Sequence, residues 1–245
     1  MFTAELENSI ENNAPVSVYS IAKKYKLENL TVIDDGTLLF PELYANINKI
    51  SNLVFGCNFT ICKDAKDKSE ESRRTECKIA VLIKNPKGYK DFLKLHNEVM
   101  TNRDYFYYHY RFDYDILQKF WTENLELVIP PYDNFLHKNL LNNGVCQPNF
   151  GKIKPSMFYS KMATLVDVML VPAIENYATN NKLELFKCHP VYYYKNTDCK
   201  TYVNFRCIEN GTEFSKPELG DFCSDKFSWE AYCKKAGIEF YDYPT

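Results

Sequence analysis

The sequence predicts an α+β fold, with mixed or antiparallel sheets and several helices, and three observations support this prediction. The chain has 245 residues and 45% hydrophobic content, which is enough for a substantial core. Short β-branched and aromatic runs, typical of strands, are spread between segments whose apolar residues recur at helical spacing. Charged stretches and Pro-, Asn- or Gly-containing turns separate the two kinds of segment, as expected for loops.

The first part of the chain is expected to consist of a short helix followed by strands. Residues 3–13 fit a helix with Thr3 as its cap, within an N-terminal arm formed by residues 1–15. The sequence LTVIDDGTLLF, residues 30–40, predicts a hairpin that turns at Asp34, Asp35 and Gly36. Two further strands are expected, with an exposed charged loop between them: residues 50–62, the loop 63–76, and residues 77–84.

Helices and strands are both expected in the remainder of the chain. The longest predicted helix covers residues 155–180, and because its apolar residues lie all around it, it should be buried, with a kink or break at Pro172. Asp133 follows Pro131 and is expected to cap the helix that begins there. The other predicted helices are residues 89–99, 115–124, 133–143 and 228–236, and the other predicted strands are residues 105–112, 125–131, 183–194, 201–208 and 238–243.

The sequence favours a single domain over residues 1–245. It contains no internal repeat, low-complexity tract or clear linker. The charged loop 63–76 is polar enough for a boundary, but a preceding piece of about 60 residues would be marginally stable alone.

The charge distribution argues against nucleic-acid and membrane partners. Thirty Lys and Arg stand against 32 Asp and Glu, and no block of one sign occurs. The most hydrophobic window, residues 162–171, contains Asp167 and falls short of the ~20 apolar residues that a membrane span requires. Residues 20–32 superficially resemble the start of a helix-turn-helix, but Asp34 and Gly36 fall where the recognition helix would run. The polar, acidic N-terminus lacks the features of a signal peptide, so export by that route is not expected.

The sequence contains no recognised catalytic or cofactor-binding motif. The patterns GxGxxG, GxxxxGK, GxSxG and HExxH are absent, and no cofactor is predicted. His109, with Asp104, Asp113 and Asp115 near it in the sequence, suggests an acid–base or metal cluster. On an extended strand, Asp113 and Asp115 would share its face and Asp104 would not. A structural role for His109 is the simpler interpretation.

The nine cysteines are candidates for disulfide bonds, because an extracellular stage would oxidise some of them. An odd number prevents complete pairing within one chain, so a bridge between two copies is conceivable. The segment Cys188-His189, followed by Cys199 and Cys207, is the nearest approach to a zinc pattern, but its gaps differ from the usual ligand spacings. The candidate disulfide residues are Cys57, Cys62, Cys77, Cys146, Cys188, Cys199, Cys207, Cys223 and Cys233.

The 19 tyrosines are the most informative feature of the sequence. The codon usage of an AT-rich genome accounts for part of this number, but such bias would spread tyrosines evenly, and here they cluster. Tyrosine combines a large apolar ring with a polar hydroxyl and is well suited to contacts between proteins. The candidate interface or pH-switch residues are Tyr105, Tyr107, Tyr108, Tyr110, Tyr114, Tyr192, Tyr193, Tyr194, Tyr241 and Tyr243.

Clustered tyrosines also predict sensitivity to alkali. A phenol titrates near pH ~10 and lysine near ~10.4, so strong alkali charges packed tyrosines while it removes the positive partners of carboxylates. An assembly held by such groups would be stable at neutral pH and would dissociate in alkali. Disulfides would make its dissociation depend on a reductant as well.

In size, tyrosine content and AT-rich composition, the chain resembles the polyhedrins, the occlusion-body matrix proteins of insect viruses, particularly those of nudivirus-like agents. The resemblance covers the whole chain and includes no diagnostic motif. It implies a structural protein, not an enzyme, that crystallises in the cytoplasm or nucleus of infected cells and dissolves in an alkaline insect gut. Its partners would be further copies of itself, with virions or envelope proteins as additional partners.

Two alternatives remain open on the sequence. One is a viral enzyme of unrecognised family, a nuclease or hydrolase that uses His109 with Asp113 and Asp115. The other is a monomeric viral protein that binds a host partner through an exposed aromatic patch.

Overall fold

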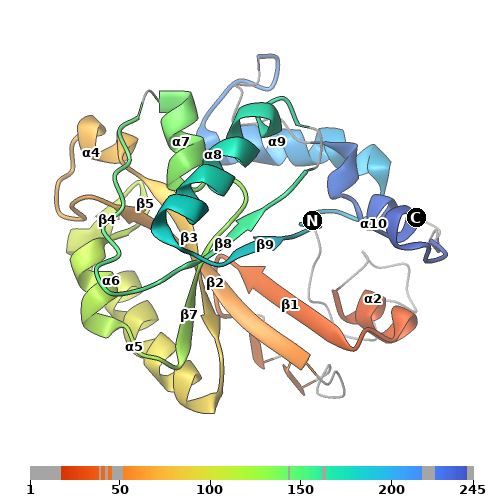
Figure 1. Cartoon of the computed structure of the whole chain (residues 1–245), viewed down its shortest axis with the longest axis horizontal. Helices are drawn as coiled ribbons and strands as arrows, with labels where there is room; N and C mark the ends of the chain where they lie inside the picture. The colour runs from red at the N-terminus through yellow and green to blue at the C-terminus, as the bar shows by residue number, and fades with distance from the viewer. Residues whose placement is uncertain are drawn as a thin grey trace.

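The fold is α+β, as predicted: a curled, mixed seven-stranded sheet is surrounded by helices (Figure 1). The structure is a computed structural model, and it describes residues 18–38, 40–41, 44–45, 52–142, 144–161, 164–216 and 224–241. The predicted helix 3–13 and the arm 1–15 lie outside these residues. The single-domain organisation stays a prediction.

The described elements follow the chain in this order. The strands of the large sheet are β1 (Asn29–Asp34), β2 (Asn52–Cys62), β3 (Cys77–Ile83), β6 (Phe112–Asp113), β7 (Leu125–Ile129), β8 (Ser156–Tyr159) and β9 (Leu185–Lys187), and a separate two-stranded ribbon consists of β4 (Phe106–Tyr107) and β5 (His109–Tyr110). The helices are α2 (Val18–Tyr25), α4 (Glu70–Arg74), α5 (Pro86–Thr101), α6 (Tyr114–Phe120), α7 (Phe135–Asn142), α8 (Asp167–Asn181), α9 (Cys199–Asn210) and α10 (Trp229–Ala236).

The sheet combines parallel and antiparallel pairs in the order β1-β2-β3-β7-β8-β9. β3 is antiparallel to both of its neighbours, β2 and β7, whereas β7, β8 and β9 are parallel to one another. The short strand β6 continues the β1 side of β2, where Phe112 pairs with Ile61. The chain therefore returns to β2 directly after the ribbon β4–β5.

The main core lies between one face of the sheet and the helices α5 to α8. Alternate residues of β3 and β7 belong to it, as the period of two in a strand requires. Helices α5 and α8 contribute residues three or four positions apart, which lie on one face of each helix. The members from these four elements are Cys77, Ile79, Val81, Leu125, Leu127, Ile129, Phe92, Leu95, Val99, Leu170, Ile174 and Ala178.

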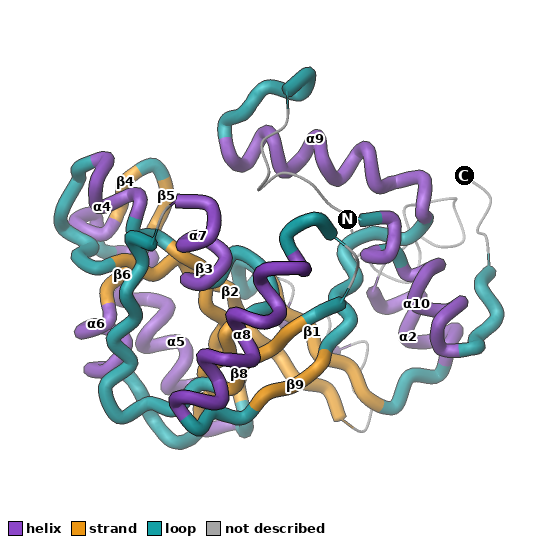
Figure 2. Tube along the Cα trace, turned by 45° about the horizontal axis from the view of Figure 1, so that its top comes forward, coloured by secondary structure: helices purple, strands orange, loops and turns teal. Residues whose placement is uncertain are grey.

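A smaller cluster joins the two ends of the described chain. Ile21 of α2 packs with Trp229 and Cys233 of α10 and with Tyr194. Helices α2 and α10 accordingly lie side by side at one end of the molecule (Figure 2).

Several elements occur where they were predicted. The strands expected at 50–62, 77–84 and 125–131 are β2, β3 and β7, and the helices expected at 89–99, 115–124, 133–143 and 228–236 are α5, α6, α7 and α10. α5 begins at Asn85, whose side chain accepts a hydrogen bond from Gly88 N, with Pro86 in the first turn. Asn134 caps α7 by accepting from His137 N, so the prediction of Asp133 as this cap was wrong.

Two further predictions, a hairpin and a long helix, were wrong. The hairpin predicted at 30–40 is absent from the described residues, because β1 pairs in parallel with β2, from Asn29 opposite Asn52 to Asp34 opposite Cys57. The helix predicted at 155–180 is split: residues 156–159 form strand β8, and among the described residues of this range the α-helix starts at Asp167. Pro172 lies within α8 without dividing it, and the break predicted there comes earlier, before Asp167.

Four further strand predictions did not hold as they were made. Residues 201–208 belong to helix α9, which ends at Gly211 with φ +69°. Of 183–194 only β9 is an extended strand, and the described part of 238–243 contains no strand. The strand predicted at 105–112 is interrupted, since the chain reverses direction between β4 and β5 and reaches β6 only at Phe112.

Candidate functional site

The aromatic run that dominates the sequence forms a tight ribbon, here called the aromatic hairpin, comprising residues 106–110. Phe106 pairs with Tyr110 and Tyr107 pairs with His109, so Tyr108 alone makes the reversal. Its φ of +62° places Tyr108 in the left-handed region, which is uncommon for a residue with a bulky side chain. The surrounding contacts must hold this backbone in place.

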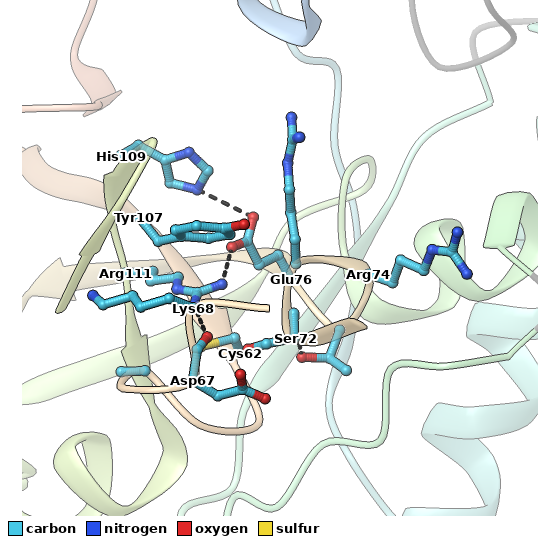
Figure 3. Close-up of polar contacts among 12 residues, drawn as sticks. Cys62, Asp67, Lys68, Ser72, Arg74, Glu76, Tyr107, His109 and Arg111 are labelled. Atoms are coloured by element: carbon cyan, nitrogen blue, oxygen red, sulfur yellow. Dashed lines mark hydrogen bonds and ion pairs between the residues drawn. The ribbon is translucent and has the colours of Figure 1, made fainter. Parts of the chain in front are cut away.

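A buried ion pair supports the base of the aromatic hairpin (Figure 3). Arg111 has no exposed surface, and its Nη1 donates to Glu76 Oε1 at 2.5 Å while its Nη2 donates to the carbonyl of Asp67. The guanidinium also lies 4.9 Å from the ring centre of Tyr107. One side chain therefore links the hairpin, the start of β3 and the loop before α4.

Glu76 binds a second residue of the aromatic hairpin. His109 Nε2 lies 3.2 Å from Glu76 Oε2, next to the pair with Arg111 (Figure 3). Burial disfavours the ionised form of Glu76, but the hydrogen bonds from His109 and Arg111 outweigh it and lower the pKa of this carboxyl. Glu76 is therefore a carboxylate at neutral pH.

The loop and helix before β3 complete the support of the hairpin. Lys68 Nζ donates to the carbonyls of Asp104 and Phe106, the latter at 2.6 Å. The hydroxyl of Tyr107 donates to Glu70 of α4 at 2.9 Å, and this bond raises the pKa of Tyr107 to about 12. Both termini of β4 are thus tied to the segment that was predicted as an exposed charged loop.

Two aromatic side chains of the hairpin are exposed to solvent. Phe106 is 48% exposed and Tyr108 is 64% exposed. Arg73 of α4 lies over the Tyr108 ring, with its Cζ 4.7 Å from the ring centre. Phe106 packs edge-on against Tyr110 at 5.1 Å. These four residues, Phe106, Tyr108, Tyr110 and Arg73, are called the hairpin patch below.

Four of the candidate tyrosines lie in the interior instead of on a surface. Tyr105 and Tyr114 belong to the main core, and Tyr193 and Tyr194 pack in the smaller clusters near α10. The hydroxyls of the last two donate to the carbonyls of Ser224 and Tyr241 respectively. In this conformation these rings stabilise the chain itself, and an interface between copies has to rest on other tyrosines.

The remaining candidate tyrosines differ in their surroundings. Tyr192 is partly buried and stacks on Tyr202 of α9, with ring centres 5.1 Å apart. Tyr241 is 41% exposed and contacts Tyr25 edge-on. Tyr243 lies outside the described residues.

Burial makes several of these phenols resistant to ionisation. It raises the pKa of Tyr114, aided by the neighbouring Cys77 thiol, and it raises the pKa of Tyr192, aided by Tyr202. Burial and Glu98 likewise raise the pKa of Tyr105. The folded chain is therefore stabilised by neutral tyrosines, and alkali that ionises them favours the unfolded chain.

The acid–base cluster considered from the sequence is not gathered around His109. The partner of His109 is Glu76, whereas Asp113 caps α6 by accepting from Ile116 N at 3.0 Å. Asp115 lies exposed in the first turn of α6. Among the described contacts, none joins His109 to either aspartate.

None of the described cysteines is joined in a disulfide, and most are buried. Cys57, Cys62, Cys77, Cys146, Cys207 and Cys233 are buried and Cys188 and Cys199 are partly buried, while Cys223 lies outside the described residues. Burial raises the pKa of both Cys57 and Cys62 to about 12. Over the described ranges no group of three or more His, Cys, Asp or Glu side chains is placed to hold a metal ion.

Comparison with protein-family models and with curated protein sequences found no match for this chain. None of the helices in the described part of the molecule is long and apolar enough to cross a bilayer.

The sequence drew attention to the aromatic residues but not to the charged residues that position them. Glu76, Glu70, Lys68 and Arg73 come from the stretch interpreted as an exposed loop. One signal was available: Arg111 interrupts an aromatic run, and an arginine buried there needs a carboxylate partner. Nothing local identifies Glu76 as that partner, because it lies 35 positions away.

Proposed function

We propose that this chain is a structural, self-associating protein whose copies contact one another through the hairpin patch, and that it forms the crystalline matrix of a viral occlusion body. The observation that carries the proposal is the exposure of Phe106 and Tyr108 on a hairpin whose base is held by a buried ion pair. A rigid aromatic surface loses little conformational entropy when it binds.

The composition of the hairpin patch supports contact between identical copies. Tyrosine and arginine, together with tryptophan, are enriched among the residues that dominate the energetics of protein interfaces. The patch contains both, with Arg73 already placed over Tyr108. In a two-fold arrangement the arginine of one copy would lie against the aromatic tip of the other, because such an interface uses the same surface twice.

The interior tyrosines support the expected response to alkali. They would act by destabilising each folded copy and not by direct repulsion between copies. The pKa values of Tyr105, Tyr114 and Tyr192 are raised by burial, so these phenols hold the fold while they are neutral. Strong alkali would ionise them, destabilise each copy and thereby dissolve the assembly. Dissolution in an alkaline gut would then accompany partial unfolding of the protein.

A concentration series tests the self-association directly. The purified full chain at neutral pH should show a mass in static light scattering that rises with concentration, and Tyr108→Ser together with Phe106→Ser should suppress the rise. Phe205→Ser is the matched control, because Phe205 is also an exposed aromatic, 51% exposed, but lies on α9. A wild-type chain that stays monomeric throughout the series would refute the proposal and leave the monomeric binding protein as the better explanation.

The assignment to an occlusion body has its own test. Expression of the full chain in insect cells should yield intracellular crystals that dissolve in strong alkali, and the double variant should remain dispersed. Self-association in vitro without crystals in cells would limit the conclusion to an oligomeric protein.

A further inference from the structure

Two buried cysteines from distant parts of the chain meet beside the base of the aromatic hairpin. Cys77 is the first residue of β3, and Cys146 lies in the segment between α7 and β8. The Cys146 Sγ is 3.6 Å from the carbonyl oxygen of Arg74 and 3.7 Å from that of Glu76, the residue directly before Cys77.

The backbone of Cys146 is held in place by a single side chain of α7. Asn139 Oδ1 accepts from Cys146 N at 2.7 Å, and Asn139 Nδ2 donates to Cys146 O at 2.8 Å. These two hydrogen bonds resemble those that a neighbouring strand would make with the Cys146 backbone, and they place the thiol toward β3. Gly144, Val145 and Gln147 beside it are exposed, and residues 144–150 form neither helix nor strand. Local opening of this segment is therefore the natural route by which solvent reaches the thiol.

Both cysteines are buried members of the main core, and Cys146 Sγ lies against the backbone that leads into Cys77. The interaction with Cys77 lowers the pKa of Cys146, whereas the same interaction and burial raise the pKa of Cys77. Cys146 is consequently the thiol that ionises first, and the thiolate is the form that oxidants attack.

We propose that Cys77 and Cys146 form an intrachain disulfide when the protein meets a small peroxide, which joins residues 144–150 covalently to the start of β3. The Cys146 thiolate attacks hydrogen peroxide, giving a sulfenic acid on Cys146 and hydroxide. The Cys77 sulfur then attacks the Cys146 sulfur, forming the S–S bond and breaking the S–O bond, and the sulfenic hydroxyl leaves with the Cys77 proton as water. In sum, two thiols and one peroxide give one disulfide and two waters.

This bridge would not depend on self-association, because both cysteines belong to one chain. The bridge would nevertheless affect the aromatic hairpin, because Glu76 directly precedes Cys77 and binds both Arg111 and His109. A bond at Cys77 would fix the strand end that carries the hairpin's ion pair. The reduced protein made in a cell and the oxidised protein outside it would then differ in the stability of the hairpin base.

Peptide mapping of the peroxide-treated full chain tests the inference. After treatment with hydrogen peroxide and alkylation under non-reducing conditions, digestion should give one linked peptide pair containing residues 77 and 146, with a mass lower by about 2 Da than the sum of the two thiol peptides. Both peptides should be alkylated at the cysteine when the treated protein is first reduced. Cys207→Ser is the matched control, because Cys207 is equally buried but lies on α9, and it should leave the linked pair unchanged.

The competing outcomes are distinct. A linked pair containing Cys62 instead of either proposed cysteine, or no linked pair at all, would overturn the inference. Since the assignment is made on wild-type protein, it holds even if Cys77→Ser fails to fold. Cys146→Ser should abolish the linked pair and leave Cys77 open to alkylation after unfolding.

Discussion

The guanidinium of Arg111 and the carboxylate of Glu76 form an ion pair with Nη1 and Oε1 2.5 Å apart, and the arginine has no exposed surface. Glu76 extends the pair to His109, so one carboxylate holds two residues from the same aromatic segment. These contacts hold the tyrosine-rich segment in a defined hairpin conformation. The first three predictions below concern its parts.

Arg111→Met should destabilise the protein by about 3–5 kcal/mol, because it leaves the Glu76 carboxylate buried without its main partner. The measurement is the free energy of unfolding in a denaturant titration. Arg103→Met, at an exposed arginine of the same region, should change it by no more than about 0.5 kcal/mol. Equal effects of the two substitutions would show that the ion pair contributes nothing to folding.

Tyr108→Asn should separate backbone strain from surface contact. Asparagine tolerates the left-handed backbone that Tyr108 adopts, so the free energy of unfolding should stay level or rise by up to about 1 kcal/mol. Self-association in light scattering should nevertheless weaken, because the ring is lost. Tyr108→Phe keeps the ring and should associate like the wild type; weak association of this variant would instead assign the effect to the hydroxyl.

Acid should weaken the hairpin base through Glu76. Its pKa is lowered from the ordinary 4.5, so the stability it contributes is fully present above that value and is lost as pH falls through the lower folded pKa. Glu76→Gln removes this dependence, and the unfolding curves of wild type and variant should converge in acid and separate toward neutral pH. Glu71→Gln on the exposed face of α4 serves as the control and should run parallel to the wild type. A constant gap between wild type and Glu76→Gln at every pH would contradict the prediction.

Alkali should unfold the chain partly through Tyr114. Burial raises its pKa above the ordinary 10.0, so its contribution is complete below that pH and is lost as pH rises toward the folded value. Tyr114→Phe should change the free energy of unfolding at neutral pH by no more than about 1 kcal/mol, because it removes one hydroxyl beside the Cys77 thiol. Above pH 10.0 the wild type should lose up to about 1.4 kcal/mol more per pH unit than the variant.

The control for this experiment is Tyr89→Phe, which alters an exposed tyrosine of α5. Its unfolding free energy should fall with rising pH in step with the wild type. If Tyr114→Phe does the same, ionisation of the buried phenol is not what limits stability in alkali.

Local patterns were reliable where one face of an element packs on the core. Strands β2, β3 and β7 and helix α5 were predicted because their burial follows the period of two or of about 3.6 residues that defines each element.

Helix α9 shows how this reasoning failed. Its β-branched and aromatic residues were interpreted as a strand, yet the partly or fully buried positions include Tyr202, Arg206 and Cys207, which share a helical face. The stop signal Gly211 was present in the sequence and would have favoured the helix.

The sequence alone did not decide which tyrosines are buried and which are exposed, as Tyr114 in the interior and Tyr108 on the surface illustrate. Both belong to the same run and have the same side chain, whose ring suits a core and whose hydroxyl suits a surface. Which of the two is chosen depends on packing partners far along the chain, such as Cys77 for Tyr114 and Arg73 for Tyr108.

The sequence by itself determined the α+β class, the central strands and helices, and the aromatic segment as the feature to explain, because these follow from composition and from periodicities within about a dozen residues. Only the tertiary structure decided which tyrosines are buried, that Glu76 binds Arg111, and that Cys146 meets Cys77. The physical reason is that burial and ion pairing are free energies of contact between segments, and a contact across 35 or more positions leaves no pattern within either segment.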